Sequence, residues 1–375
     1  LSAGEECWWR VKVWDQNNEA SEWSEPAVWV AGLPEKEWKA QWIGVPWQGE
    51  TALDEMEDKT PPPAPLLRKT FQVEKGLKSA RIWISGLGYY ELRLNGQKVG
   101  DEVLVPNQTN YDRRNGLMER PIPVPDHFTG YKVMYLSYDV TQSLAQGENA
   151  LGVILGNGFY NAEQNWVKGY GSPRLLLQMQ LEYEDGRKET IVSDPSWKVS
   201  RSAIVSDMIY QGEHYDARLE QPGWDTASFD DSKWEQAVLR KTPYGRLVAQ
   251  NGPSDRVMER LQPQKIDKLG EGHYRIDFGE EISGWLRLND VEGPAGQRID
   301  IRYICESTMG SNSYTLKGEG KENYATRFTW YVFREVEVKG WPGELKPEQV
   351  TAEAVYSDVK RVGFFESSNE LINTI

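Results

Sequence analysis

The feature of this sequence that most constrains its fold is a series of short alternating apolar segments separated by tight-turn signals. In residues 80–103, apolar and polar positions alternate on both sides of the dipeptide Asn95-Gly96. A period of two is typical of half-buried strands, and Asn-Gly is favoured in type I′ hairpin turns. Residues 174–192 repeat the pattern around an Asp-Gly dipeptide, and residues 149–160 form a nearly continuous apolar run that suits a central strand. We therefore predict an all-β fold.

Length and composition indicate several β domains in series. Glycine (34), proline (20) and tryptophan (16) are plentiful, which favours short strands and turns over helices. A chain of 375 residues suits two or three domains of about 100 to 200 residues each. The predicted organisation is a partial fibronectin type III-like module at 1–33, a linker with an acidic, proline-rich insertion at 34–65, a jelly-roll-like sandwich at 66–245, and a second β-sandwich at 250–358. Tandem β-sandwich, jelly-roll-like domains are thus the expected fold class.

The N-terminal segment is the least self-sufficient of these parts. Its order, WRVKVWDQNNEASEWSEP, resembles the last strands of a fibronectin type III domain. Two strands cannot enclose a core, because an isolated hairpin is marginal in water. We expect this segment to need further strands or a neighbouring domain.

Charge and hydropathy exclude several classes of partner. The net charge of −14 argues against nucleic acid, whose binding needs concentrated Lys and Arg. No apolar window approaches the roughly 20 residues of a membrane span, so we expect no membrane insertion. Cys7 and Cys305, and the three histidines His127, His214 and His273, form no metal-binding spacing.

The sequence contains, in this order, the phrases GYYELRLNGQKVGDEVLVP, YLSYDVTQSLAQGENALGVILGNGFY, GEHYDARLEQPGW with FDDSKW, DFGEEISGWLRLNDVEGPAGQRIDIRYICE, and RFTWYVFREVEVKGWPG. Together these phrases resemble glycoside hydrolase family 78, the bacterial α-L-rhamnosidases. The resemblance implies a fibronectin-like module, a jelly-roll-like sandwich and a second, concanavalin-like sandwich. In that family an (α/α)6 barrel follows, which carries the catalytic carboxylates and removes terminal L-rhamnose with inversion.

The resemblance makes this segment an accessory, non-catalytic part of a rhamnosidase. Residues 359–375 look like the entry to the absent barrel, so we expect no catalytic residue here and no activity from this chain alone. The cluster Asp277, Glu280 and Glu281 is interpreted as a solvated turn between strands. L-rhamnose-containing glycans are the expected partner, and the family's substrates imply a periplasmic or secreted protein.

Two loops combine aromatic rings with amide and carboxylate groups, which is the mixture that sugar sites use. Some family members use the first sandwich as a calcium-dependent rhamnose-binding module, and calcium prefers oxygen ligands. By resemblance we place a calcium site at Asp112 and Asn157. The predicted sugar-binding residues are Asn107, Asn110, Tyr111, Asp112, Asn157, Tyr160, Asn161, Glu163 and Trp166.

Two alternatives stay open beside sugar binding. The sandwiches could be structural spacers with no ligand, in which case Trp166 and Tyr160 cap the sandwich core and the asparagines satisfy turn backbone. The chain could also be a self-sufficient enzyme. The loop at 113–133 is longer than the family pattern leads us to expect, which is a departure close to the predicted sugar site. For Trp8, Trp9, Trp83, Trp285 and Trp330 we expect packing in the core or at domain interfaces.

Overall fold

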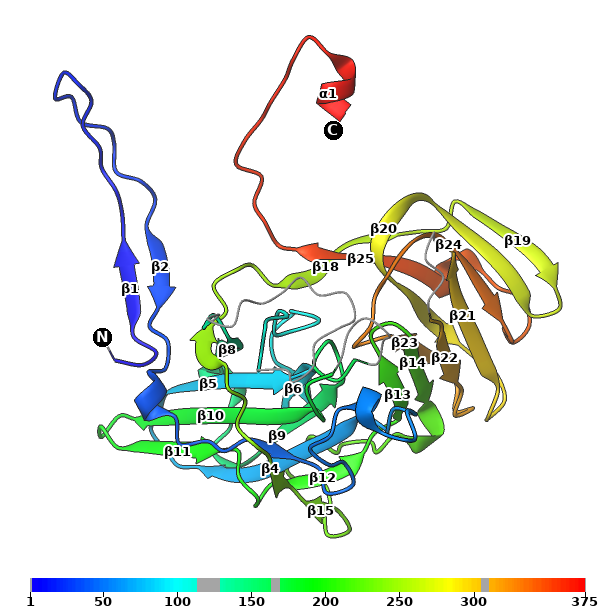
Figure 1. The fold of residues 1–375 in the computed structure, drawn as a ribbon, viewed down its shortest axis with the longest axis horizontal. Coiled ribbons are helices and arrows are strands. Elements are labelled where there is room, and N and C mark those ends of the chain that lie inside the picture. The colour runs from blue at the N-terminus through cyan, green and yellow to red at the C-terminus, as the bar shows by residue number, and fades with distance from the viewer. Residues whose placement is uncertain (1, 113–128, 163–168, 305–309, 375) are drawn as a thin grey trace.

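The computed structural model describes residues 2–112, 129–162, 169–304 and 310–374. The fold is almost entirely β, as predicted, with one short α-helix, α1 (Glu370–Thr374), and two packed β-sandwiches (Figure 1). Short 3-10 helices lie in the connections: η1 (Glu35–Glu37), η2 (Leu53–Glu55), η3 (Thr141–Ser143), η4 (Ala217–Leu219) and η5 (Pro347–Gln349). Within the described residues, no helix is long and apolar enough to cross a membrane.

The first sandwich consists of two sheets. One has the order β15 (Glu235–Gln236), β12 (Lys198–Arg201), β4 (Pro65–Val73), β9 (Gly147–Gly156), β6 (Tyr89–Leu94), β7 (Gln97–Lys98). The other has the order β16 (Val238–Leu239), β3 (Ile43–Gly44), β10 (Arg174–Tyr183), β5 (Leu77–Leu87), β8 (Lys132–Asp139), β17 (Arg246–Ala249), with β11 (Lys188–Val192) on β10. The predicted central strand is β9, which is buried along most of its length between β4 and β6.

The predicted Asn-Gly hairpin is confirmed. Asn95 and Gly96 have φ values of 50° and 83°, and Leu94 pairs with Gln97. Positive φ at both central residues is what a type I′ turn requires. This turn holds β6 and β7 at the edge of the sheet that faces the second sandwich.

The strands of the second sandwich are hydrogen-bonded into a single ten-stranded sheet. Its order is β13 (Ile204–Met208), β14 (Gly212–Asp216), β22 (Asn312–Thr315), β21 (Arg298–Ile304), β24 (Tyr331–Lys339), β20 (His273–Val291), β25 (Val350–Ser357), β18 (Asp255–Leu261), with β19 (Lys265–Gly270) and β23 (Glu322–Ala325) on β20. The interpretation of Asp277, Glu280 and Glu281 as a turn is wrong, because they lie within the continuous strand β20. The pairing of β20 with β24 shifts register between Asp277 and Ile282, so Gly279 lies in a β-bulge.

The two sandwiches are joined through shared structure. β13 and β14 precede the last strands of the first sandwich in sequence, yet β14 pairs in parallel with β22 of the second. Gly156, at the end of β9, lies against Phe328 so closely that an added Cβ would be 2.3 Å from its Cγ. Glycine is therefore needed where β9 meets the second sandwich.

Both ends of the chain extend away from the sandwiches (Figure 1). The N-terminal hairpin pairs β1 (Glu6–Trp9) with β2 (Ala27–Val30), and its Trp8 and Trp9 are exposed. Trp83 and Trp285 are buried as expected, whereas Trp330 is 36% exposed. The apolar side chains of the hairpin therefore have no core of their own.

Candidate functional site between the sandwiches

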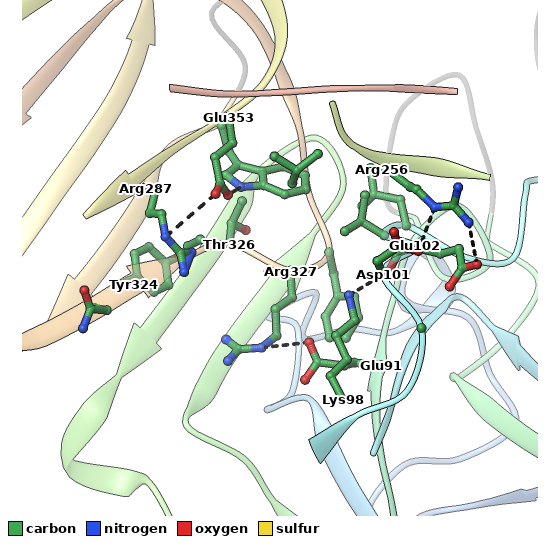
Figure 2. Close-up of a pocket in the computed structure, with 18 of the residues that line it drawn as sticks. Glu91, Lys98, Asp101, Glu102, Arg256, Arg287, Tyr324, Thr326, Arg327 and Glu353 are labelled. Carbon is green, nitrogen blue, oxygen red and sulfur yellow. Dashed lines mark hydrogen bonds and ion pairs between the residues drawn. The ribbon is translucent and has the colours of Figure 1, made fainter. Parts of the chain in front are cut away.

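A cleft of about 690 Å3 lies where the first sandwich faces the second (Figure 2). β6 and the segment after β7 form one wall, and β18, β20, β25 and residues 323–328 form the other. Charged groups of both signs line it: Lys98, Arg256, Arg260, Arg287 and Arg327, with Glu91, Asp101, Glu102, Glu220 and Glu353.

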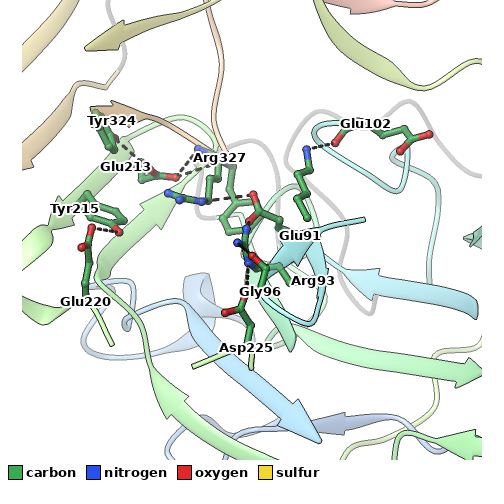
Figure 3. A network of polar contacts seen from close by, with 12 residues as sticks. Glu91, Arg93, Gly96, Glu102, Glu213, Tyr215, Glu220, Asp225, Tyr324 and Arg327 are labelled. Atoms are coloured by element: carbon green, nitrogen blue, oxygen red, sulfur yellow. Dashed lines mark hydrogen bonds and ion pairs between the residues drawn. The ribbon is translucent and has the colours of Figure 1, made fainter. Parts of the chain in front are cut away.

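The pair Arg327 and Glu91 spans the cleft. The Arg327 Nε lies 3.6 Å from a Glu91 carboxylate oxygen, and Figure 2 shows the two side chains directed at each other. Arg93 approaches the same carboxylate at 3.0 Å and also donates to Asp225 and to the Gly96 carbonyl (Figure 3). Burial by itself would raise the pKa of Glu91, but Arg327 and Arg93 outweigh it and hold that pKa below its usual value.

Glu353 organises the opposite side of the cleft. It is 3% exposed, and it accepts a hydrogen bond of 2.8 Å from the Trp285 indole nitrogen. Arg260 lies 3.1 Å and Arg287 3.8 Å from the same carboxylate. A buried carboxylate needs such partners, because an unpaired charge would be costly to desolvate.

Arg256 ties the loop after β7 to the second sandwich. Its guanidinium lies 2.7 Å from Asp101 and 3.1 Å from Glu102, and it also contacts Asp358 just beyond β25. Charge-assisted pairs of this kind are geometrically specific. Together with Arg327 and Glu91, they fix the relative position of the two sandwiches.

Two further carboxyl groups lie wholly inside the protein beside this cleft. Glu213 accepts from the Tyr324 hydroxyl at 3.1 Å and from the Arg327 backbone N–H at 2.9 Å (Figure 3). Asp207 accepts from the Asn157 backbone N–H at 2.7 Å. Burial raises the pKa of Glu213 and raises the pKa of Asp207 to about 7.

Among the described residues, no carboxyl group with a raised pKa is open to the cleft. A general acid needs a raised pKa and access to the substrate. Glu91 faces the cleft but has a lowered pKa, whereas Asp207 and Glu213 have raised pKa values but are inaccessible. Glu91, Asp101 and Glu102 instead form ion pairs with Arg327 and Arg256 that connect the sandwiches. Glu353 pairs with arginines of its own sandwich.

The structure brings the predicted aromatic residues together in a small core. Tyr111 and Tyr160 are both 1% exposed, and their ring centroids are 5.4 Å apart in an edge-to-face arrangement. Tyr170 stacks on Tyr160 at 5.5 Å. These rings pack against one another between the two predicted sugar-binding loops.

The predicted amides Asn157 and Asn161 are buried as well. Asn161 donates to the Asn157 side-chain oxygen at 2.7 Å and accepts from the Leu53 backbone N–H at 2.8 Å. Asn157 donates to the Asp207 carbonyl at 2.8 Å. Their hydrogen bonds thus serve the protein interior, and a ligand that used them would have to replace these bonds.

The remaining predicted residues lie nearer the surface. Asn107 is held through its backbone N–H, which donates to the Gln250 side chain at 2.8 Å. The backbone carbonyl of the exposed Asn110 accepts from the Lys132 backbone N–H at 3.0 Å. Asp112 is half-buried. Glu163 and Trp166, like Cys305 and His127, lie outside the described residues.

The calcium prediction stays a prediction. The Asn157 side-chain oxygen is buried and already accepts from Asn161 at 2.7 Å. Over the described ranges, no group of three or more His, Cys, Asp or Glu residues is placed to hold a metal ion. Any calcium site would therefore need amide or carbonyl oxygens beside Asp112.

Sequence reasoning missed the ion pairs of the cleft. One signal was present for Glu353, a single acidic residue in the otherwise apolar or neutral run VTAEAVYS. A charge on a strand that is buried along most of its length must find a partner. The sequence around Glu91 and Arg327 gives no comparable signal, because these two residues meet only when the two sandwiches pack.

Three family models match the chain in sequence order. The Rha78A-like, N-terminal immunoglobulin domain matches residues 1–35, the α-L-rhamnosidase N-terminal domain matches residues 75–119 and 125–259, and the bacterial α-L-rhamnosidase concanavalin-like domain matches residues 267–356. The first match describes an immunoglobulin domain where the sequence resembled a fibronectin type III module. The other two cover most of the first and second sandwiches.

Individual relatives match along the whole chain. An α-L-rhamnosidase of Formosa agariphila is 33% identical over 100% of this chain, which spans 41% of that protein. Solved α-L-rhamnosidase structures from Dictyoglumus thermophilum and Aspergillus terreus are 36% and 33% identical, with TM-scores of 0.85 and 0.81 over 100% of this chain. This chain covers 42% and 43% of those two structures. The matching domain models and these full-chain similarities identify it as a member of the α-L-rhamnosidase family, corresponding to the N-terminal β-sandwich region.

Proposed function

We propose that this chain is the non-catalytic accessory region of an α-L-rhamnosidase, and that it supports the domain that hydrolyses terminal α-L-rhamnose. The observation that carries the proposal is the pairing of cleft carboxylates with arginines of the facing sandwich, as in Glu91 and Arg327. Carboxylates used in this way hold domains together and are poorly suited to general acid catalysis. A rigid double sandwich is well suited to positioning a catalytic domain.

Exposed apolar residues at the C-terminal end support the same role. Val362, Phe364 and Phe365 are largely exposed, as is Leu371 in α1. Apolar side chains gathered in this way mark a surface that another part of a protein covers. In the proposed parent enzyme, the catalytic domain covers this segment. The glycan substrates that we propose place the enzyme in the periplasm or outside the cell.

The activity of the chain by itself tests the accessory role. We expect no turnover of an aryl α-L-rhamnoside by this chain under conditions where the Formosa agariphila relative, as the positive control, is tested in parallel. Turnover that survives purification and disappears on unfolding the chain would contradict the proposal. It would favour the alternative of a self-sufficient enzyme.

Binding of L-rhamnose is a second proposed function, and the surface position of Asn107 favours it. Titration calorimetry with L-rhamnose, with calcium and again with a chelator, tests it, and D-glucose is the control sugar. Heat that saturates only with L-rhamnose supports binding, and loss of that heat with the chelator supports the calcium site at Asp112 and Asn157. The absence of heat with millimolar sugar would favour a purely structural spacer.

A further inference from the structure

We propose that a second groove, lined by Trp330, Tyr356 and Asn107, binds one ring of a neutral saccharide. The groove has a volume of about 430 Å3 and lies at the junction of the sandwiches. Its volume is within the range of roughly 300 to 1,000 Å3 that small-molecule sites occupy. This inference rests on the proposed binding of rhamnose and places it in a groove that includes Asn107 but not Asp112 or Asn157.

Aromatic side chains form one wall of the groove. Trp330, just before β24, is 36% exposed although its neighbours Thr329 and Tyr331 are buried. Tyr356 is 44% exposed, and its hydroxyl donates to Glu259 at 2.6 Å, which fixes the ring. An exposed indole beside a fixed phenol ring offers a platform for the apolar C–H face of a sugar.

Polar groups with unused hydrogen-bonding capacity line the rest of the groove. Within the described chain, the side-chain amides of Asn107 and Gln108 and the hydroxyl of Ser283 form no hydrogen bond with the protein. Asp255 accepts from the Ser357 hydroxyl through one oxygen at 2.7 Å, and its second oxygen has no such partner. Amide and carboxylate groups together can donate to and accept from neighbouring sugar hydroxyls.

The charges of the groove select a neutral ligand. The described residues that line it include one carboxylate, Asp255, and no Lys, Arg or His. An acidic sugar would therefore meet a negative charge without a compensating cation. The charged cleft on Arg327 and Glu91 differs in this respect, because its cations and carboxylates already pair with one another.

Calorimetric titration of the full chain and its variants tests this site. We expect saturable binding of L-rhamnose, no binding of D-galacturonate, and affinity at least about ten-fold weaker in Trp330→Ala and Asn107→Ala, which remove the platform and an amide. Trp23→Ala is the matched control, because Trp23 is 49% exposed on the N-terminal hairpin. Its affinity should equal that of the unmodified chain. Melting temperatures verify that each variant is folded.

Each outcome separates this site from the accessory role. No binding of L-rhamnose at tens of millimolar overturns the site, and so does binding that both Trp330→Ala and Asn107→Ala leave unchanged. Neither result touches the proposed accessory role, which depends on the lack of catalysis. Hydrolysis of an aryl α-L-rhamnoside by the chain would contradict the accessory role and leave the groove to be judged by the two variants.

Discussion

The guanidinium of Arg327 lies 3.6 Å from the carboxylate of Glu91, so that an arginine of the second sandwich meets a glutamate of the first. Arg327 precedes β24, whereas Glu91 lies within β6. Their contact is one of the links between the two sandwiches, beside the pairing of β14 with β22. Four predictions about these contacts and the buried groups near them can be measured.

Breaking the pair should lower the free energy of unfolding. Glu91 and Arg327 have 15% and 30% exposed side chains, so we place the loss between that of surface pairs and buried pairs, at about 1 to 3 kcal/mol for Glu91→Gln or Arg327→Met. Urea denaturation measures it, and the double variant should lose less than the sum of the two. Asp300→Asn breaks a largely exposed pair with Arg298 and should cost less than about 1 kcal/mol. Equal losses in all three single variants would contradict this.

A methyl group at Gly156 should disturb the contact between the sandwiches. Because an added Cβ would lie 2.3 Å from the Phe328 ring, we expect Gly156→Ala to lower stability by about 1 to 3 kcal/mol. Gly252→Ala is the control, since no atom lies within 4 Å of its added Cβ. In a Phe328→Ala background the cost of Gly156→Ala should shrink. If the cost stays the same in that background, the clash is not its cause.

Stability should fall as the pH rises from 5 to 7. Burial raises the pKa of Asp207 from 3.8 to about 7, so the folded state retains a proton that the unfolded state releases. The stabilisation by protonated Asp207 is fully present below the pKa of this group in the unfolded chain and is lost as the pH approaches 7. Over that range the free energy of unfolding falls by about 1.4 kcal/mol per pH unit. Glu213, which faces Asp207 and also has a raised pKa, acts in the same direction.

The variant Asp207→Asn isolates this effect. Its amide oxygen can still accept from the Asn157 backbone N–H, but it does not titrate. Urea denaturation at pH 5 and pH 7 should therefore show a drop smaller by about 2 to 3 kcal/mol in the variant than in the unmodified chain. Identical drops would mean that Asp207 is ionised in the folded protein at both pH values.

Removing the Glu353 carboxyl group should lower the free energy of unfolding more than replacing it with a neutral amide. Glu353→Gln keeps an oxygen that can accept from the Trp285 indole, whereas Glu353→Ala leaves that buried N–H and the facing arginines without the acceptor. We expect losses of about 1 kcal/mol for the glutamine variant and about 3 kcal/mol for the alanine variant. The same free energy for both, measured by urea denaturation, would show that the charge alone matters.

Local pattern was sufficient for the β class and for individual strands. Alternation around Asn95-Gly96 predicts a hairpin that the structure contains, and the apolar run at 149–160 predicts β9. Pattern was misleading at Gly279, where turn residues lie in a bulge of β20, because a neighbouring strand continues the pairing on both sides. It also did not predict that β14 pairs with β22 of the second sandwich.

The sequence by itself determined the all-β class, the positions of many strands and turns, and the resemblance to α-L-rhamnosidases, because these depend on periodicity and short phrases. Only the tertiary structure decided that Glu91 meets Arg327, that Asn157 and Tyr160 face the interior, and that Trp330 lies beside Asn107 on an open groove. The physical reason is that burial and pairing depend on how two sheets pack, and residues distant in sequence become partners only when that packing sets their register.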